Sequence, residues 1–129
     1  MSFQQSVQYN FDIQTKCVYV DSESRPDQGY YFFVYKISIT NKGNAPAQLM
    51  SRHWIITDAM GNVEEVRGPG VVGLQPQIQP GQTFEYESAS HLSTSTGSMK
   101  GFYEFSGTDG TSFQVEIPEF YLIEPRSLH

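Results

Sequence analysis

A glycine-rich segment, GPGVVG at residues 68–73, has the letter pattern of the loop that holds the pyrophosphate of a dinucleotide. In nucleotide-binding folds a strand leads into this loop and a helix begins after it, because the helix N-terminus binds the phosphates. Here LQPQIQP follows, and its prolines, Pro76 and Pro80, exclude a helix interior. A P-loop also needs Lys and Ser or Thr after its last glycine, where this chain has Leu74 and Gln75. The sequence therefore argues against both nucleotide-binding folds.

Small-anion binding by the same segment is a separate hypothesis. The backbone amides of Gly68, Gly70 and Gly73 can form an anion-binding concavity. Arg67 lies beside them, and Arg52 lies in the preceding strand pattern. The alternative is a structural turn that needs glycine because its backbone φ angles are positive. The sequence leaves both interpretations open, and the candidate anion or nucleotide site consists of these five residues.

Neither a metal site nor a cofactor is predicted. The residues that could bind transition-metal ions are His53, His91, His129 and Cys17. They are scattered and show no short ligand spacing. The candidates for a hard ion such as magnesium are Asp58, Glu64, Glu65, Glu85 and Glu87. Carboxylates on an exposed strand more often keep the strand soluble and prevent it from pairing.

The sequence also argues against catalysis. The serines of residues 93–98 lack the strand–turn–helix context of a nucleophile, and His91 is near them only in sequence. Cys17 lies inside a strand pattern, where a buried and inert thiol is expected. Glu104 and Glu116 alternate with aromatic residues, which is typical of outward strand positions and not of a buried acid–base pair. We therefore expect a protein that is not an enzyme.

The composition of the chain limits the classes of molecule that it can bind and the compartment in which it is expected. Eight Lys and Arg stand against fourteen Asp and Glu, and the formal net charge of −6 repels nucleic acids and anionic membrane surfaces. The single cysteine, Cys17, excludes an internal disulfide and favours a reducing compartment. The start of the chain, MSFQQSVQYNF, has neither a basic leader nor an apolar run. These features predict a soluble cytoplasmic protein that binds neither nucleic acid nor membranes.

Alternation with a period of two predicts β-strands along most of the chain. YYFFVYKISITN places Tyr31, Phe33, Tyr35, Ile37 and Ile39 on one face. MKGFYEFSG and TSFQVEIPEF are expected to pair as a hairpin across residues 108–110, whereas STSTGS at residues 93–98 is expected to be a mobile loop. Closely spaced strands without a helical period indicate an all-β antiparallel sandwich or barrel.

Arg52 has the strand parity of Met50 and Trp54, so its charged group must either reach the rim of the core or find a partner. A sharper hypothesis joins Arg52, His53 and residues 67–73 into one patch, with residues 93–98 as a flap. Whether these segments converge depends on strand pairing. The sheet faces, open edges and loops of such a fold can accept a partner peptide or an identical subunit.

The residues SRHWIITDAMGNVEEVRGPGVVGLQPQIQPGQTFEYESASHL, followed by GSMKGFYEF and FQVEIPEFYL, resemble the ApaG family of bacterial proteins. The resemblance covers almost the whole chain and implies one ApaG domain over residues 1–129. It implies an immunoglobulin-like or fibronectin type III-like β-sandwich, in agreement with the strand pattern. It also implies a link to cobalt resistance and magnesium efflux, and gene neighbourhood with a dinucleoside-tetraphosphate hydrolase. Eukaryotic relatives use the domain to recognise proteins, and no catalytic residues come with the family.

The residues and the resemblance together predict a non-enzymatic binding domain. Its expected partner is a protein of unknown identity, and a second copy of the chain is a further candidate, as a homodimer. The alternative is a protein that binds a small anion or nucleotide through Arg52, Arg67, Gly68, Gly70 and Gly73.

Overall fold

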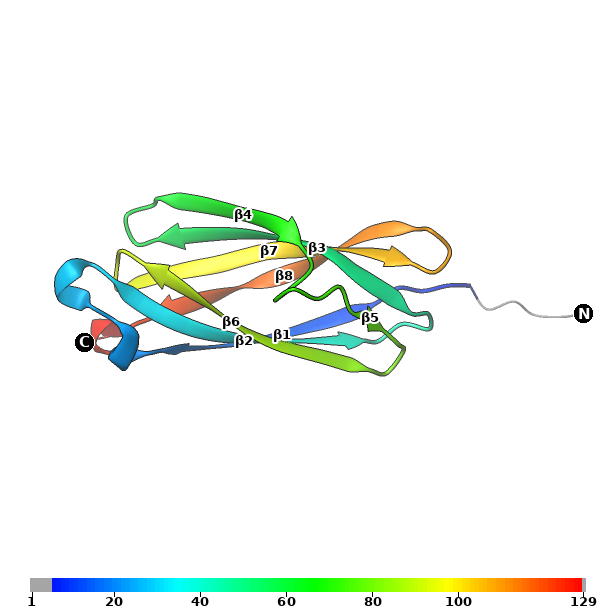
Figure 1. Ribbon diagram of the computed structural model, residues 1–129, viewed down its shortest axis with the longest axis horizontal. Coiled ribbons are helices and arrows are strands. Elements are labelled where there is room, and N and C mark those ends of the chain that lie inside the picture. Colours follow the sequence, from blue (N-terminus) through cyan, green and yellow to red (C-terminus); the bar gives the residue numbers. More distant parts are fainter. Residues whose placement is uncertain (1–5, 129) are drawn as a thin grey trace, which may run out of the picture.

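The computed structural model describes residues 6–128, in which two antiparallel sheets pack face to face (Figure 1). The smaller sheet has the strand order β1-β2-β6, and the larger has β4-β3-β7-β8 with β5 paired to the start of β3. The strands are β1 (Phe11–Tyr19), β2 (Tyr31–Asn41), β3 (Ala47–Asp58), β4 (Val63–Pro69), β5 (Gln77–Ile78), β6 (Thr83–Leu92), β7 (Thr96–Gly107) and β8 (Ser112–Ile123). Short 3₁₀ helices are η1 (Asp21–Glu23), η2 (Pro26–Gln28) and η3 (Pro125–Leu128). The predicted all-β sandwich is confirmed.

The core lies between the sheets and is rich in aromatic rings. The alternation predicted for β2 is present, because Phe33, Tyr35, Ile37 and Ile39 are all buried. The larger sheet contributes Leu49, Trp54, Met99, Tyr103, Phe105, Ile117 and Leu122. Burying one such side chain stabilises the fold by roughly 1.5–3 kcal/mol. The flat side chains that the composition favours therefore hold the two sheets together.

The two long sides of the sandwich differ. On one side, β1 lies against β8 and closes the gap between the sheets. On the other side, a groove separates β4 from β6. The inward positions of β6 change from Phe84 and Tyr86 to Ser88 and Ser90, whose small side chains line this groove. The sandwich is therefore closed along β1 and β8 and open along β4 and β6.

Three local predictions have different outcomes. The chain after Gly73 forms the short strand β5 and no helix, in agreement with the exclusion of a helix there, and the β7–β8 hairpin is also confirmed. The prediction of a loop is wrong for residues 96–98, which begin β7: all three pair with β8, and residues 97 and 98 also pair with β3. A Cβ at Gly97 would lie 2.5 Å from the Thr57 carbonyl oxygen, so the small residue here permits close strand packing. Within the described residues, no helix has the length and apolar character needed to cross a membrane.

Candidate functional site

The β3–β4 hairpin places the charged candidates on opposite faces of the larger sheet. Directly opposed residues of an antiparallel pair share a face, and the register pairs His53 with Arg67 and Arg52 with Gly68. On the outer face, Arg67 Nε lies 3.3 Å from His53 Nε2. Glu65 Oε1 lies 2.8 Å from the same nitrogen. This nitrogen can either donate or accept, and the shorter distance favours donation from His53 to Glu65.

Arg52 extends across β4 on the core side of the sheet. It has the parity of the buried Trp54, and its Nη1 donates hydrogen bonds to the carbonyl oxygens of Pro69 and Gly70, both at 2.9 Å. Gly68 makes room for this contact, because a Cβ there would lie 3.0–3.1 Å from three guanidinium atoms. Among residues 6–128, no carboxylate forms an ion pair with Arg52. Arg52 therefore finds its partners in backbone carbonyl oxygens.

The glycine-rich segment is a tight turn after β4. Gly70 and Gly73 have φ angles of 59° and 80°, and Val72 has φ 44°. The amide of Gly70 donates to the Met50 carbonyl oxygen at 2.9 Å. Val71 and Leu74 exchange both backbone hydrogen bonds, at 2.8 and 2.9 Å, which closes the turn. The amides of residues 70, 71 and 74 are thus used within the chain.

An open hollow lies against the outer face of the larger sheet, and we call it the outer-face hollow. Its volume is about 620 Å³. It is lined by Met50, Ser51, Arg52, His53, Arg67, Gly68, Pro69, Phe102 and Glu104. The Phe102 ring meets the His53 ring edge-on, with centroids 4.8 Å apart. At the exposed rim, Arg67 and Glu104 have opposite charges.

The hypothesis of a single patch is thus supported for some of its residues only. Arg52, His53 and residues 67–69 contribute to the outer-face hollow. Within the described chain, residues 70–73 and 93–98 do not line it, and Ser93 lines a different hollow near Asp58 and His91. The predicted flap therefore does not cover the patch.

The ApaG domain profile matches residues 21–107, which include the hairpin and the turn after it. The chain belongs to the ApaG family. It is 72% identical to Protein ApaG of Bdellovibrio bacteriovorus over 120 residues, covering 93% of this chain and 94% of that protein. It is 51% identical to Protein ApaG of Dechloromonas aromatica, covering 94% and 95%. A crystal structure from Bordetella pertussis, described as an ApaA protein, has 49% identity and a TM-score of 0.89, covering 92% of this chain and 96% of that one.

The other residues of this ApaG-family chain that were considered for catalysis or metal binding are partly buried or make contacts within the fold. Burial raises the pKa of the Cys17 thiol to about 11, so it is protonated at neutral pH. Asp58 Oδ1 accepts the amides of Met60 and Asn62, both at 2.9 Å, within the β3–β4 turn. Glu85 accepts a hydrogen bond from Ser38 and lies 3.2 Å from Lys36 Nζ. In the part of the chain that the structure describes, no three His, Cys, Asp or Glu side chains gather as metal ligands.

Sequence reasoning missed two features of the ApaG fold. Phe102 was not among the candidates, although its outward parity in β7 is opposite to that of the buried Tyr103. The groove between β4 and β6 was also missed, although the small residues Ser88 and Ser90 at inward positions of β6 are its signal. His129, a candidate metal ligand, lies outside the described residues.

Proposed function

We propose that this ApaG-family chain is a non-enzymatic binding domain that recognises another protein through the outer-face hollow. The observation that carries the proposal is the mixed character of the lining: Phe102, Met50 and Pro69 are apolar, and Arg67 and Glu104 carry opposite charges at the rim. An aromatic anchor surrounded by charged groups is typical of protein-recognition surfaces. The hollow is open, which suits a protruding side chain of a partner.

The alternative candidate is a small anion or nucleotide bound by Arg52, Arg67, Gly68, Gly70 and Gly73. Among residues 6–128, Arg52 forms no ion pair with a carboxylate, which favours this candidate. Two contacts argue against it, because the Gly70 amide donates to Met50 and Arg52 Nη1 is held by two carbonyl oxygens. Protein recognition is therefore the better supported function.

The family-level link to cobalt resistance and magnesium efflux fits this proposal as an indirect effect. Asp58 accepts a backbone hydrogen bond within its own turn, and Glu85 forms an ion pair with Lys36. Both carboxylates therefore have structural partners without a metal ion. On this proposal the chain acts on divalent cations through the protein that it binds. We place it in the cytoplasm, where a single cysteine such as Cys17 remains reduced.

The test compares two phenylalanine variants on the outer faces of the two sheets. Phe102→Ala removes the wall of the outer-face hollow, and Phe32→Ala removes a half-buried ring from the smaller sheet. Affinity capture from native lysate, read by quantitative mass spectrometry, should show partners that the wild type and Phe32→Ala retain and Phe102→Ala loses. A partner set unchanged by Phe102→Ala would contradict the proposal. A titration with inorganic phosphate, followed at the backbone amides of residues 67–73, tests the alternative separately.

A further inference from the structure

Strand β4 forms a free edge of the larger sheet in the described chain, along the upper margin of Figure 1. A backbone hydrogen bond lies at each end of the β3–β4 ladder. The Asp58 amide donates to the Asn62 carbonyl oxygen at one end, and the Gly70 amide donates to the Met50 carbonyl oxygen at the other. Hydrogen-bonded pairs alternate along an antiparallel ladder, so the even-numbered residues of β4 bond to β3. The odd-numbered residues, 63 to 69, therefore direct their amides and carbonyls away from the sheet. Pro69 is the exception, because it has no amide hydrogen.

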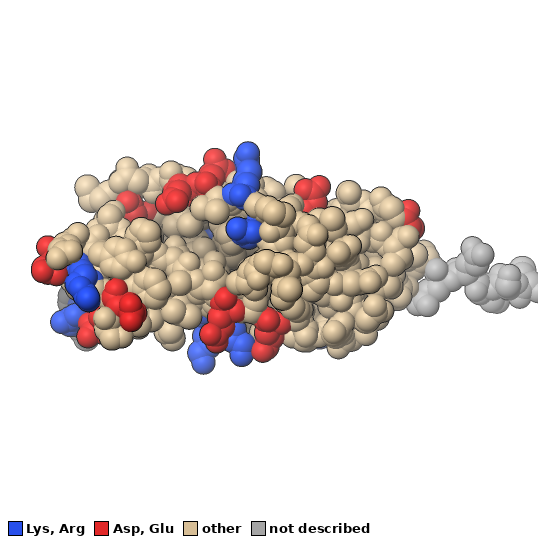
Figure 2. All heavy atoms as spheres, in the orientation of Figure 1, with Lys and Arg blue, Asp and Glu red and all other residues tan. Residues whose placement is uncertain are grey.

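The charges along this edge have a symmetric order. On the outer face, Glu65 and Arg67 lie on either side of the position of Val66. On the core-side face, Glu64 lies before Val66, and the guanidinium of Arg52 lies over Gly68 after it. In Figure 2 acidic and basic atoms lie next to each other along the upper margin, where Figure 1 places β4. Each face of the edge thus has an acidic group before Val66 and a basic group after it.

We propose that β4 pairs antiparallel with β4 of a second copy of the chain, about a two-fold axis at Val66. In this register Glu65 faces the partner's Arg67 on the outer face. Glu64 faces the partner's Gly68 on the core-side face and so meets the guanidinium of the partner's Arg52. Within residues 6–128 of one protomer, Arg52 has no carboxylate as an ion-pair partner. In the dimer, Glu64 of the neighbouring protomer supplies one. The inference goes beyond the proposed function and does not depend on the outer-face hollow.

Backbone geometry supports the same register. Glu65 and the partner's Arg67 both direct their polar groups outward, so they exchange both backbone hydrogen bonds. Pro69 falls opposite the partner's Val63, where it can still accept a hydrogen bond. Charge excludes the two adjacent registers, because one sets Glu65 against the partner's Glu65 and the other sets Arg67 against the partner's Arg67.

The edge therefore favours one closed pair. Charged residues on an edge strand usually prevent association, but mixed charges in this order attract a second copy in the proposed register and repel it in both adjacent registers. A two-fold contact uses the same surface on both protomers and leaves no free β4 edge, so it ends at a dimer.

Sedimentation velocity of the full chain, from low micromolar to near-millimolar concentration, tests the dimer. The wild type should dimerise with increasing concentration. Glu65→Lys and Arg67→Glu should each raise the dissociation constant on the order of tenfold, because attraction becomes repulsion at two symmetric sites. The combined Glu65→Lys/Arg67→Glu variant should restore dimerisation, since opposite charges face each other again. Lys16→Glu, at an exposed position of β1, makes the same charge change as Arg67→Glu and should have no effect.

A wild type that remains monomeric at every concentration would overturn the proposal. A double variant that fails to recover, while retaining the wild-type circular dichroism spectrum, would also overturn it. Phe102→Ala should leave dimerisation unchanged, so the two proposals can fail independently.

Disulfide formation tests the register. In a Cys17→Ser background, Val66→Cys places two sulfurs at the axis in a pair without backbone hydrogen bonds, about 4.5 Å apart at Cα. This variant should form a covalent dimer under mild oxidation. Val63→Cys is the control, because Val63 is 62% exposed but lies opposite the partner's Pro69. Equal or faster cross-linking of Val63→Cys would overturn the register.

Discussion

Val72 carries backbone strain at an exposed turn. Among the described residues it is the non-glycine residue with a positive φ, 44°, and its side chain is 53% exposed. A β-branched residue is crowded in this conformation and gains little from packing when it is exposed. With Gly73 it forms a two-residue turn in which both φ angles are positive, and Asn-Gly is the sequence that such turns favour. Valine at position 72 therefore lowers the stability of the fold.

Val72→Asn should stabilise the fold. Asn adopts the left-handed region more easily than valine, so the free energy of unfolding should rise by about 0.5–1 kcal/mol. Urea denaturation followed by tryptophan fluorescence measures the change, because Trp54 is buried in the core. An unchanged or lower midpoint would show that the Val72 side chain makes a compensating contact.

Gly70→Val should have the opposite effect in the same turn. Gly70 has φ 59°, and a Cβ there would lie 2.1 Å from the Leu74 carbonyl oxygen. The backbone must move, and the free energy of unfolding should fall by about 2–4 kcal/mol in the same urea assay. The anion-site interpretation predicts another outcome, with unchanged stability and lost phosphate shifts. Glycine at position 70 is needed for the turn if the first result is obtained.

At the level of the elements, strands were predictable where one face is buried. The alternating apolar residues of β2 identified which side chains point into the core, because burial of one face of a strand produces a sequence period of two. The pairing of His53 with Arg67 and of Arg52 with Gly68 was not predictable, because it depends on the β3–β4 register. Composition misled at residues 96–98, where small residues allow strands to approach and do not mark a loop. Non-local pairing is thus the information that the local pattern lacks.

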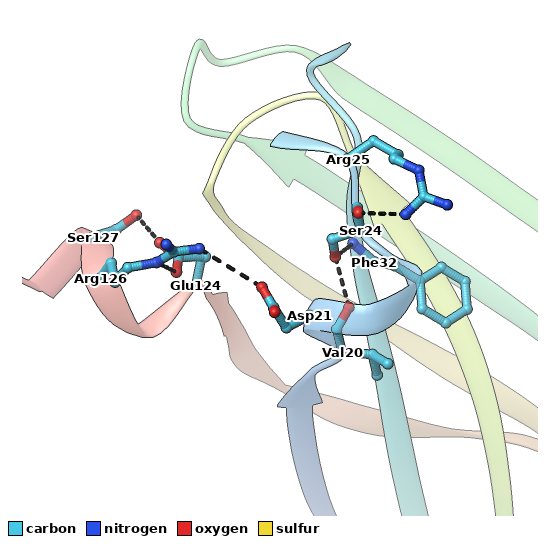
Figure 3. Close-up of polar contacts among 8 residues, drawn as sticks. All are labelled: Val20, Asp21, Ser24, Arg25, Phe32, Glu124, Arg126 and Ser127. Atoms are coloured by element: carbon cyan, nitrogen blue, oxygen red, sulfur yellow. Dashed lines mark hydrogen bonds and ion pairs between the residues drawn. The ribbon is translucent and has the colours of Figure 1, made fainter. Parts of the chain in front are cut away.

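The end of β8 is held by a short polar cluster around η3 (Figure 3). Glu124 is 6% exposed, and its Oε1 accepts a hydrogen bond from Arg126 Nε at 2.9 Å. Arg126 Nη2 also lies 3.7 Å from Asp21 in η1. The hydrogen bond from Arg126 lowers the pKa of Glu124 below its usual value of 4.5. The stabilisation from this contact is therefore present above pH 4.5 and is lost as the pH falls through the lowered pKa.

Arg126→Ala should raise the pKa of Glu124 towards 4.5, because the main group that stabilises the carboxylate is removed. An NMR titration of the side-chain carboxyl carbon measures this shift directly. Arg25→Ala is the matched control, since Arg25 Nη1 donates to the Ser24 carbonyl oxygen and no dashed line joins Arg25 to Glu124 in Figure 3. A Glu124 midpoint that is equal in the wild type and Arg126→Ala would contradict this assignment.

For the whole molecule, the closed and open sides of the sandwich differ in how the sheets are joined. On the closed side, Phe113 of β8 stacks between rings from other segments, with centroids 4.5 Å from Tyr9, 6.1 Å from Phe11 and 5.6 Å from Phe105. These contacts join the two sheets. The free edge of β4 and the outer-face hollow both lie on the larger sheet, away from this cluster. On the two proposals above, the surfaces used for recognition and dimerisation therefore lie outside the aromatic cluster that joins the sheets.

This separation predicts unequal costs for two Phe→Ala changes. Phe113→Ala removes a ring that packs against the core cluster from both sheets, so the free energy of unfolding should fall by about 2–4 kcal/mol. Phe102→Ala removes a ring that lies in the outer-face hollow, and its cost should be below about 1 kcal/mol. Urea denaturation of both variants decides the point. If Phe102→Ala were as costly as Phe113→Ala, the ring would be a structural part of the sheet, and a lost partner could no longer be assigned to recognition.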